Sequence, residues 1–344
     1  MKKIIFSCFS LLAFSFGFGQ NIKTPVDYLN YIGKETELIS NSTWTYTKTV
    51  AHSKNADEIE QSRRNLVQYI QNASEKIEAL KTGFKGDLDY RNQLLSYFLI
   101  SERYINDDYG EIINLQEIAD QSYDFMETYI TTRDLINQKL NDEIEKLTLN
   151  QKNFGKKYNI QMAEDKSDLG KKMRISNEVF AYHTQMYLIF FKVNITDSNL
   201  SKAIQRNDLA NIQQLASSLE LYADEGLGKI KDLKPYNKDA SLLIATKKAL
   251  EFYKKEAVVL TPKIINYLLL NQKIEDIKGS LDNKAQKDRS FQEINDFNNL
   301  VNRTNKEIDE FNKLNSKFYQ EKTAVNSTWE QTGSDFISKH VPKD

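Results

Sequence analysis

Apolar residues recur at alternating spacings of three and four along most of this 344-residue chain. Between residues 56 and 82 they fall at Ile59, Leu66, Ile70, Ala73, Ile77 and Leu80, and Arg63 occupies the one remaining position. This spacing places the apolar side chains on one face of an α-helix that packs against other helices. We therefore expect the chain to fold chiefly as long amphipathic helices.

A second stretch of the chain carries the same pattern. From about residue 207 to residue 234 the apolar positions are Leu209, Ile212, Ala216, Leu219, Ala223, Gly226, Ile230 and Leu233, so that a shift of 153 places Ile59 on Ile212. The first stretch ends in a turn at Gly83 to Gly86 and the second at Pro235, with Asp87 and Asp239 placed to cap the next helices. The shared register predicts an internal repeat.

The remaining helices complete two similar halves. We expect helices over residues 28–50, 87–113 and 115–157 in the first half, and over 168–205, 239–272 and 290–338 in the second, with Pro262 kinking or splitting the helix that contains it. The polar segment 159–167 predicts a linker between bundles at 20–158 and 168–344, and the charged segment 278–288 predicts a loop or a frayed helix end before a cap at Ser290. The predicted fold is all-α: two tandem long-helix up-down bundles of about four helices each, related by an internal repeat.

Composition agrees with this fold and narrows the chemistry. The chain contains only 12 Gly, 4 Pro, 1 Cys and 3 His. An all-β domain of this size would need more turn residues, and a disulfide framework or a Cys/His metal site would need more of those ligands. Because 47 Lys and Arg are balanced by 48 Asp and Glu, the sequence lacks the basic excess that nucleic-acid binding requires.

The first nineteen residues predict export. Lys2 and Lys3 precede an apolar stretch from Ile4 to Phe18, and Gly17-Phe18-Gly19 is a small-residue cleavage pattern, which makes residues 1–19 a signal peptide cleaved before Gln20. The alternative is acylation of Cys8, because Ile5-Phe6-Ser7-Cys8 loosely resembles a lipobox. No later apolar run is long enough to span a membrane. The expected location is the periplasm, the cell surface or the extracellular space.

Four short runs carry a family resemblance. They are Pro25 to Ile32, Lys76 to Lys81 leading into Phe84-Lys85-Gly86-Asp87 and Arg91, the aromatic helix from Tyr97 to Ile113, and Phe154 to Tyr158. Together they resemble a family of exported bacterial surface proteins of unknown function that takes its name from a leptospiral sequence and is frequent in Bacteroidota. The resemblance implies a helical protein with no established activity. Gly110 and the pair Lys238-Asp239 depart from the family pattern.

The sequence offers no constellation typical of catalysis or of a cofactor. A di-iron bundle site needs Glu three residues before a His, which none of His52, His183 and His340 has, and Cys-x-x-Cys-His haem attachment is impossible with one cysteine. No Gly-rich loop ends in the Lys-Ser/Thr of a phosphate site. We therefore predict a protein that is not an enzyme and that binds no cofactor and no metal.

Candidate interaction residues form two groups. The first consists of Asp107, Asp108 and Glu111, with Tyr104 and Tyr109 close by in sequence; the carboxylates lie within about one helical turn and are either ligands for a hard cation or a solvated helix face. The second consists of Trp329 and Phe336 near the C-terminus, which either dock on the second bundle or face a partner.

Two functions remain open after the search for motifs. The first is a non-catalytic surface or envelope module that binds an unknown envelope or extracellular protein or acts as a spacer. The alternative is a small-ligand or metal-binding protein, including an enzyme, with a site between helices of the first bundle. The absence of reactive motifs favours the first.

Overall fold

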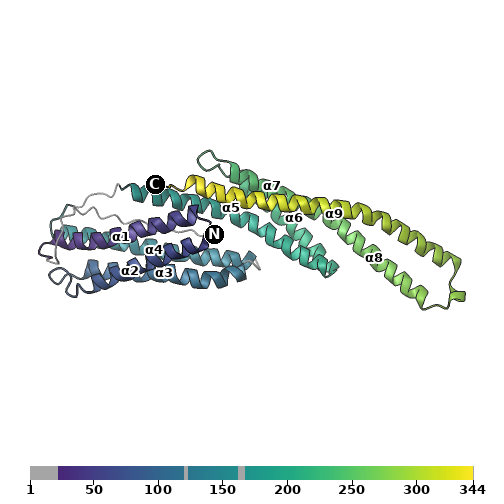
Figure 1. Ribbon diagram of the computed structural model, residues 1–344, viewed down its shortest axis with the longest axis horizontal. Helices are drawn as coiled ribbons and strands as arrows, with labels where there is room; N and C mark the ends of the chain where they lie inside the picture. Colours follow the sequence, from purple (N-terminus) through teal and green to yellow (C-terminus); the bar gives the residue numbers. More distant parts are fainter. Residues whose placement is uncertain (1–21, 120–122, 162–166, 344) are drawn as a thin grey trace. The chain divides into compact units, whose positions relative to one another are not determined.

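A computed structural model describes residues 22–119, 123–161 and 167–343, without the side chains of 107–119, 124 and 127–137 (Figure 1). Its helices are α1 (Pro25–His52), α2 (Ala56–Glu78), α3 (Asp89–Ala119), α4 (Tyr123–Lys157), α5 (Asp168–Gln205), α6 (Leu209–Lys231), α7 (Ser241–Lys255), η1 (Glu256–Leu260), α8 (Thr261–Asp282), η2 (Gln286–Asp288) and α9 (Phe291–His340). The predicted all-α class is therefore confirmed. The predicted signal peptide at 1–19, with Cys8, lies outside the described residues.

Helix boundaries follow local signals where the sequence supplies them. Ser290 and Glu293 form a capping box before α9: the Glu293 amide donates to Ser290 Oγ at 3.1 Å, and the Ser290 amide donates to Glu293 Oε2 at 3.0 Å. The predicted end of the third helix at residue 113 is wrong, because α3 continues to Ala119. No Gly or Pro stands there to stop a helix. The segment 278–288 is helical as far as Asp282.

A π-helical turn joins α7 to α8. The turn η1 spans Glu256–Leu260, and Pro262 follows it in the first turn of α8. Proline lacks an amide hydrogen and its ring crowds the carbonyl four residues earlier, so it disrupts a regular α-helix. Here α7, η1 and α8 follow one another without a loop, and the irregularity expected at Pro262 takes the form of the wider π turn.

Contacts divide the chain into two units. The first contains residues up to Thr184 together with Ser334 onwards, and the second contains Gln185–Gly333. The division falls inside α5 and inside α9, rather than at the segment 159–167 where the sequence placed a linker.

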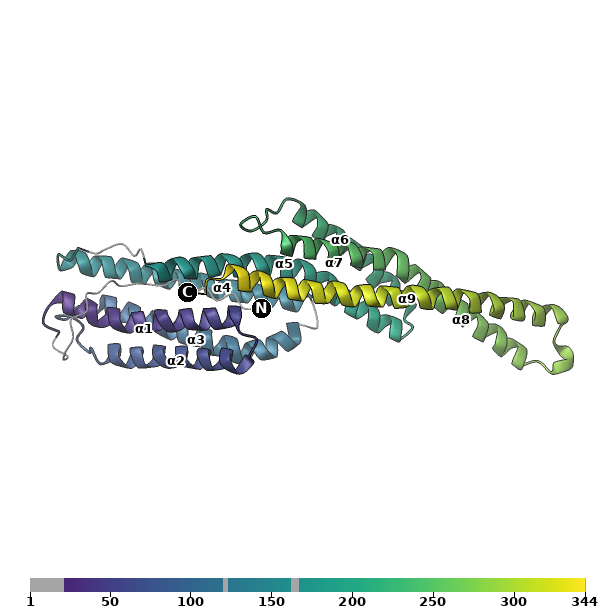
Figure 2. The ribbon, with the colours of Figure 1, turned by 45° about the horizontal axis from the view of Figure 1, so that its top comes forward.

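In the first unit α1 packs on α2, α2 on α3 and α3 on α4, and both views show these four helices side by side (Figures 1 and 2). Aromatic rings fill the core at one end of the bundle. Phe154 lies 5.3 Å from Tyr28, 6.0 Å from Phe84 and 4.6 Å from Tyr158, measured between ring centroids. Tyr28 and Phe84 are almost completely buried, so this cluster is held by apolar packing.

In the second unit α6 packs on α7 and on the start of α8. Gly226 of α6 permits a close approach: a Cβ atom there would lie 2.8 Å from Leu250 of α7 and 3.1 Å from Ile189 of α5. The indole of Trp329 stacks on Phe190 with 4.3 Å between ring centroids, and its Nε1 donates to Thr246 Oγ1 at 3.0 Å. These contacts join α5, α7 and α9 around one core.

Candidate functional site

The residues predicted to form an interaction surface are dispersed. Tyr104 is buried in the core of the first unit. Trp329 is buried in the second unit, whereas Phe336 belongs to the first, where it stacks on Tyr182 at 5.5 Å. Both side chains are buried, and the rings that they stack on, Phe190 and Tyr182, lie within the predicted second bundle at 168–344, as the docking alternative expects. The side chains of Asp107, Asp108, Tyr109 and Glu111 lie outside the description.

The described part of the chain has neither a metal-ligand cluster nor a membrane-spanning helix. There, no three His, Cys, Asp or Glu side chains are grouped closely enough to hold a metal ion. No helix in the described ranges is both long and apolar enough to cross a membrane.

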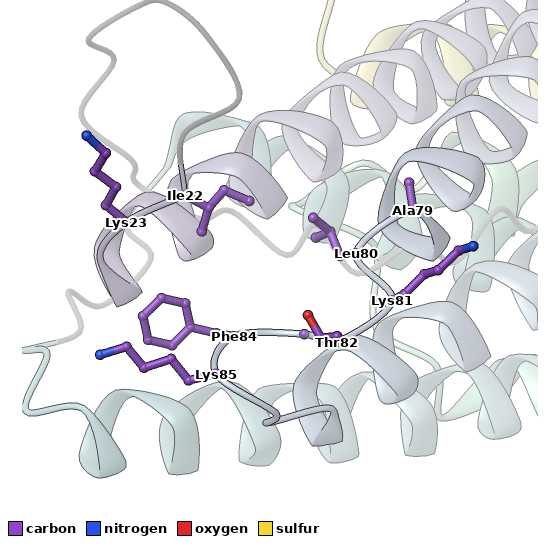
Figure 3. A pocket seen from close by; sticks show the side chains of 9 residues that line it. Ile22, Lys23, Ala79, Leu80, Lys81, Thr82, Phe84 and Lys85 are labelled. Carbon is purple, nitrogen blue, oxygen red and sulfur yellow. The ribbon is translucent and has the colours of Figure 1, made fainter.

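A surface hollow lies beside the turn between α2 and α3. Its volume is about 460 Å³, and it is lined by Ile22, Lys23 and residues 79–85. Figure 3 shows Ile22 and Leu80 bordering the open space, while the amine ends of Lys23, Lys81 and Lys85 point away from it. Ligand sites usually direct several polar groups at one point. The diverging amines of this hollow do not provide that geometry.

Three charged groups meet inside the second unit. Lys322 Nζ of α9 donates to both carboxylate oxygens of Asp197 of α5, at 2.7 and 2.8 Å, and lies 2.8 Å from Oε1 of Glu256 in the π turn. Asp197 and Glu256 are buried, and Glu256 Oε2 has no hydrogen-bond partner among the described residues. We call these three residues the charged cluster.

Burial and the neighbouring Asp197 carboxylate raise the pKa of Glu256 to about 8, although Lys322 acts in the opposite direction. Burial lowers the pKa of Lys322, but the Asp197 charge and the hydrogen bonds to Asp197 and Glu256 raise it more, so the ammonium stays charged. At neutral pH one cation and one anion then meet one protonated carboxyl group. The cluster therefore links α5, η1 and α9 without a net charge, which is a structural role.

Next to the charged cluster lies a neutral network. The Tyr253 hydroxyl is 2.8 Å from Asn194 Oδ1 and 2.9 Å from Asn326 Oδ1. A hydroxyl has one proton, so it donates to one of these two amide oxygens at a time. Sequence reasoning missed both networks, because their members are far apart in the chain and no local pattern distinguishes them.

A pair of helices in the second unit also exposes apolar side chains. We define the arm as residues 264–318, which comprise most of α8, the connection and the first part of α9; the two helices lie side by side (Figures 1 and 2). Tyr267 stacks on Phe311 at 5.1 Å, Asn266 Nδ2 donates to Glu307 Oε2 at 2.6 Å, and Lys284 pairs with Glu293. These contacts establish which residues face each other.

Most large apolar side chains of the arm are only partly covered, and on α8 they are spread around the helix rather than confined to one face. Between residues 265 and 317, all of which the structure describes, Leu281 is the only large apolar side chain that is buried. The partly exposed ones are Ile265, Tyr267, Leu268, Leu270, Ile274, Ile277, Phe297, Leu300, Val301, Ile308, Phe311 and Leu314. Two helices cannot enclose a seam that four would share, so each apolar side chain keeps an open side.

A second feature of the arm lies on the flank of α9. Phe291, Asn298, Asn305, Asn312 and Tyr319 follow one another at intervals of seven residues, and all five are exposed. Phe291 is 86% exposed and Tyr319 71%, the highest values among the large apolar side chains described. We call this row the asparagine stripe. It begins just before the arm seam and ends just after it.

Comparison with known proteins adds no relative from which a function can be transferred. No family model, no curated protein and no solved structure matches the chain.

Proposed function

We propose that the protein is an exported, non-catalytic helical module of the cell envelope or cell surface, and that the arm is its binding surface. The observation that carries this proposal is the set of partly exposed apolar side chains on α8 and α9 of the arm. Contiguous apolar surface that water still reaches is typical of a site where another macromolecule binds. The resemblance to exported bacterial surface proteins is compatible with this proposal.

Photo-crosslinking from the arm tests the binding surface. A photoreactive residue replaces Ile294 on the seam of α9, which is 41% exposed, and a matched one replaces Ile244 of α7, which is 52% exposed. In envelope extracts of the source organism we expect discrete covalent adducts from position 294 and none from 244. Equal labelling at the two positions, or no adduct at 294, would contradict the proposal.

The export proposal has its own test. Mass spectrometry of the mature protein from its host should find Gln20 at the N-terminus. A chain that begins at an acylated Cys8 would replace the soluble form of the proposal by a lipid-anchored one, and an intact Met1 would refute export. Native mass spectrometry of the same sample addresses the ligand-binding alternative, which a stoichiometric small molecule or metal would support.

We also propose that α2–turn–α3 and α6–turn–α7 are copies of one unit. α2 and α6 each have 23 residues, and both turns contain an isolated bridge, Phe84 to Asp87 and Tyr236 to Asp239, around two residues with positive φ. In the first turn Gly86 has φ 85°, and in the second Lys238 has φ 67°.

Placing the glycine of the first turn at the matching position of the second turn tests whether the two units are copies. Glycine adopts positive φ without strain, so Lys238→Gly should raise the free energy of unfolding by about 0.5–1 kcal/mol. The same change at Lys234, which lies outside the positive-φ positions, is the control and should not stabilise. A destabilised Lys238→Gly variant would show that the two turns do not accept each other's residues.

A further inference from the structure

We propose that the arm binds the arm of a second copy of this chain, with the two α9 helices antiparallel and related by a two-fold axis at Asn305. This inference rests on the proposed function of the arm and names its partner. The asparagine stripe carries it, because the stripe is unchanged when it is read backwards from Asn305: an asparagine seven residues away on each side and an aromatic residue fourteen away on each side.

An antiparallel pair brings together positions that are equally distant from the axis. Asn305 then faces the partner's Asn305, Asn298 faces the partner's Asn312, and Phe291 faces the partner's Tyr319. An asparagine amide is both a donor and an acceptor, so two of them can satisfy each other. An aromatic pair at each end would cover the two most exposed apolar rings of the described chain.

The stripe lies on the flank of α9 that α8 leaves free. Glu293 and Glu307, which contact Lys284 and Asn266 of α8, lie on the other side of the seam. A second α9 can therefore lie against the stripe without displacing α8. Seven-residue spacing falls slightly short of two turns of a straight helix, and a left-handed supercoil keeps such a row aligned between two helices.

Uncharged residues at these positions need an explanation. Asparagine is a poor helix former, and none of the five stripe positions carries a charge, whereas seven of the other fourteen exposed positions between Gln292 and Lys317 do. A row of lysine or glutamate would repel the same row of a second copy, whereas asparagine does not. The composition of the stripe therefore fits self-association better than solvation.

The apolar residues are symmetric about a level one residue away, at Thr304. On α9, Phe297 and Phe311 lie on either side of Thr304 at equal distances, and on α8 Ile264 and Leu281 are equidistant from the step between Gln272 and Lys273. The contacts of Asn266 and Tyr267 at one end of the arm, and of Lys284 at the other, place Gln272 and Lys273 beside Thr304. One two-fold axis therefore serves both helices to within one residue, and the pair of arms forms a four-helix bundle that covers the seam.

The area is sufficient for a stable pair. A helix of the length of the stripe extends for about 40 Å, and a two-helix face of about 20 Å width gives on the order of 800 Å² per partner, the size of a standard protein interface.

Charge substitution at the axis tests the inference in the full-length chain. Sedimentation equilibrium should show a dimer for the wild type. Asn305→Lys and Asn305→Asp each place like charges together, so each should weaken the dimer at least about tenfold, and an equimolar mixture of the two variants should restore it. Asn299→Lys, on the outer face of the same helix, is the control and should leave the dimer unchanged.

Crosslinking tests the direction of pairing. In a Cys8→Ser background, a mixture of Asn298→Cys and Asn312→Cys chains should form a disulfide between the two variants and little between identical chains. Disulfides between identical chains alone would overturn the antiparallel arrangement. A wild-type chain that stays monomeric at all concentrations would overturn self-association. If the chain is monomeric but a photoreactive residue at position 294 labels another protein, self-association is wrong and the binding function of the arm still holds. If position 294 labels nothing, both the binding function and self-association are wrong.

Discussion

The cores of the two units are built on the same sequence pattern from different chemistry. The first unit buries the Glu35 carboxylate against the half-exposed Lys76 ammonium, and its Tyr28 and Tyr90 hydroxyls are buried without a hydrogen-bond partner in the described residues. The second unit buries Asp197, Glu256 and Lys322 together and gives the Tyr253 hydroxyl two amide neighbours. The 3-4 spacing of apolar residues thus specifies a helix and its buried face. It does not determine which polar groups are buried on that face.

Removal of a ring from the first core should have the largest effect. Phe154 contacts several aromatic neighbours and is 3% exposed, so Phe154→Ala should lower the free energy of unfolding by about 3–5 kcal/mol. Urea titration followed by circular dichroism measures it. Phe125→Ala on the same helix, at a position 54% exposed, is the control. Equal effects of the two substitutions would mean that the aromatic cluster does not stabilise the first unit.

Removal of the cation from the charged cluster should come next. Lys322→Ala leaves two buried carboxyl groups without a counter-ion and should cost about 2–4 kcal/mol. The same titration measures this loss, and Lys317→Ala, at an exposed position of the same helix, should leave the midpoint unchanged. If Lys322→Ala is as stable as the wild type, the second core does not depend on its charges.

The charged cluster should also make stability depend on pH. The pKa of Glu256 is raised from 4.5 to about 8, so the folded state holds this proton more tightly than the unfolded state. Its contribution is complete below about pH 4.5 and is lost as the pH rises through about 8. Glu256→Gln keeps a neutral group of similar shape, so its urea midpoint should fall less than that of the wild type between about pH 5 and about pH 9. A decline as steep as that of the wild type would assign the pH dependence to other groups.

The smallest expected effects distinguish the two cores by sign. Tyr28→Phe removes a buried hydroxyl that has no partner and should stabilise the protein by up to about 1 kcal/mol. Tyr253→Phe breaks hydrogen bonds to Asn194 and Asn326 and should destabilise it by about 1–2 kcal/mol. Thermal melting of the two variants, each compared with the wild type, measures both changes. Shifts in the same direction would mean that the buried tyrosine hydroxyls have the same role in the two cores.

The sequence predicts the helices well because their signal is local. The helix expected over 168–205 has those bounds in the structure, and Ser290 caps α9 as expected. The seam does not reveal how many helices share it, so the arm and the four-helix core of the first unit look alike in the sequence. Partners from distant segments are equally hidden: Asp197, Glu256 and Lys322 are ordinary charged residues until the fold brings them together.

The sequence also does not reveal which aromatic residues are exposed. Tyr104 and Trp329 were candidates for a partner surface, but both lie at seam positions and are buried. Phe291 and Tyr319, which the sequence analysis did not select, are the exposed rings. The sequence shows that Phe291 and Tyr319 are spaced from Asn305 by multiples of seven residues. Only their exposure in the structure distinguishes the asparagine stripe from the neighbouring apolar positions.

The π turn η1 determines how the face of α7 that packs in the second core is oriented relative to the face of α8 in the arm. A π turn accommodates one residue more than an α turn, and each residue of an α-helix advances the face by about 100°. The extra residue therefore changes which face α8 presents relative to α7. Deletion of one residue from Glu256–Leu260, for example the exposed Val258, would preserve the sequence of both helices yet rotate the arm relative to α7. The turn thus sets the rotation of the arm about the helix axis relative to the second core.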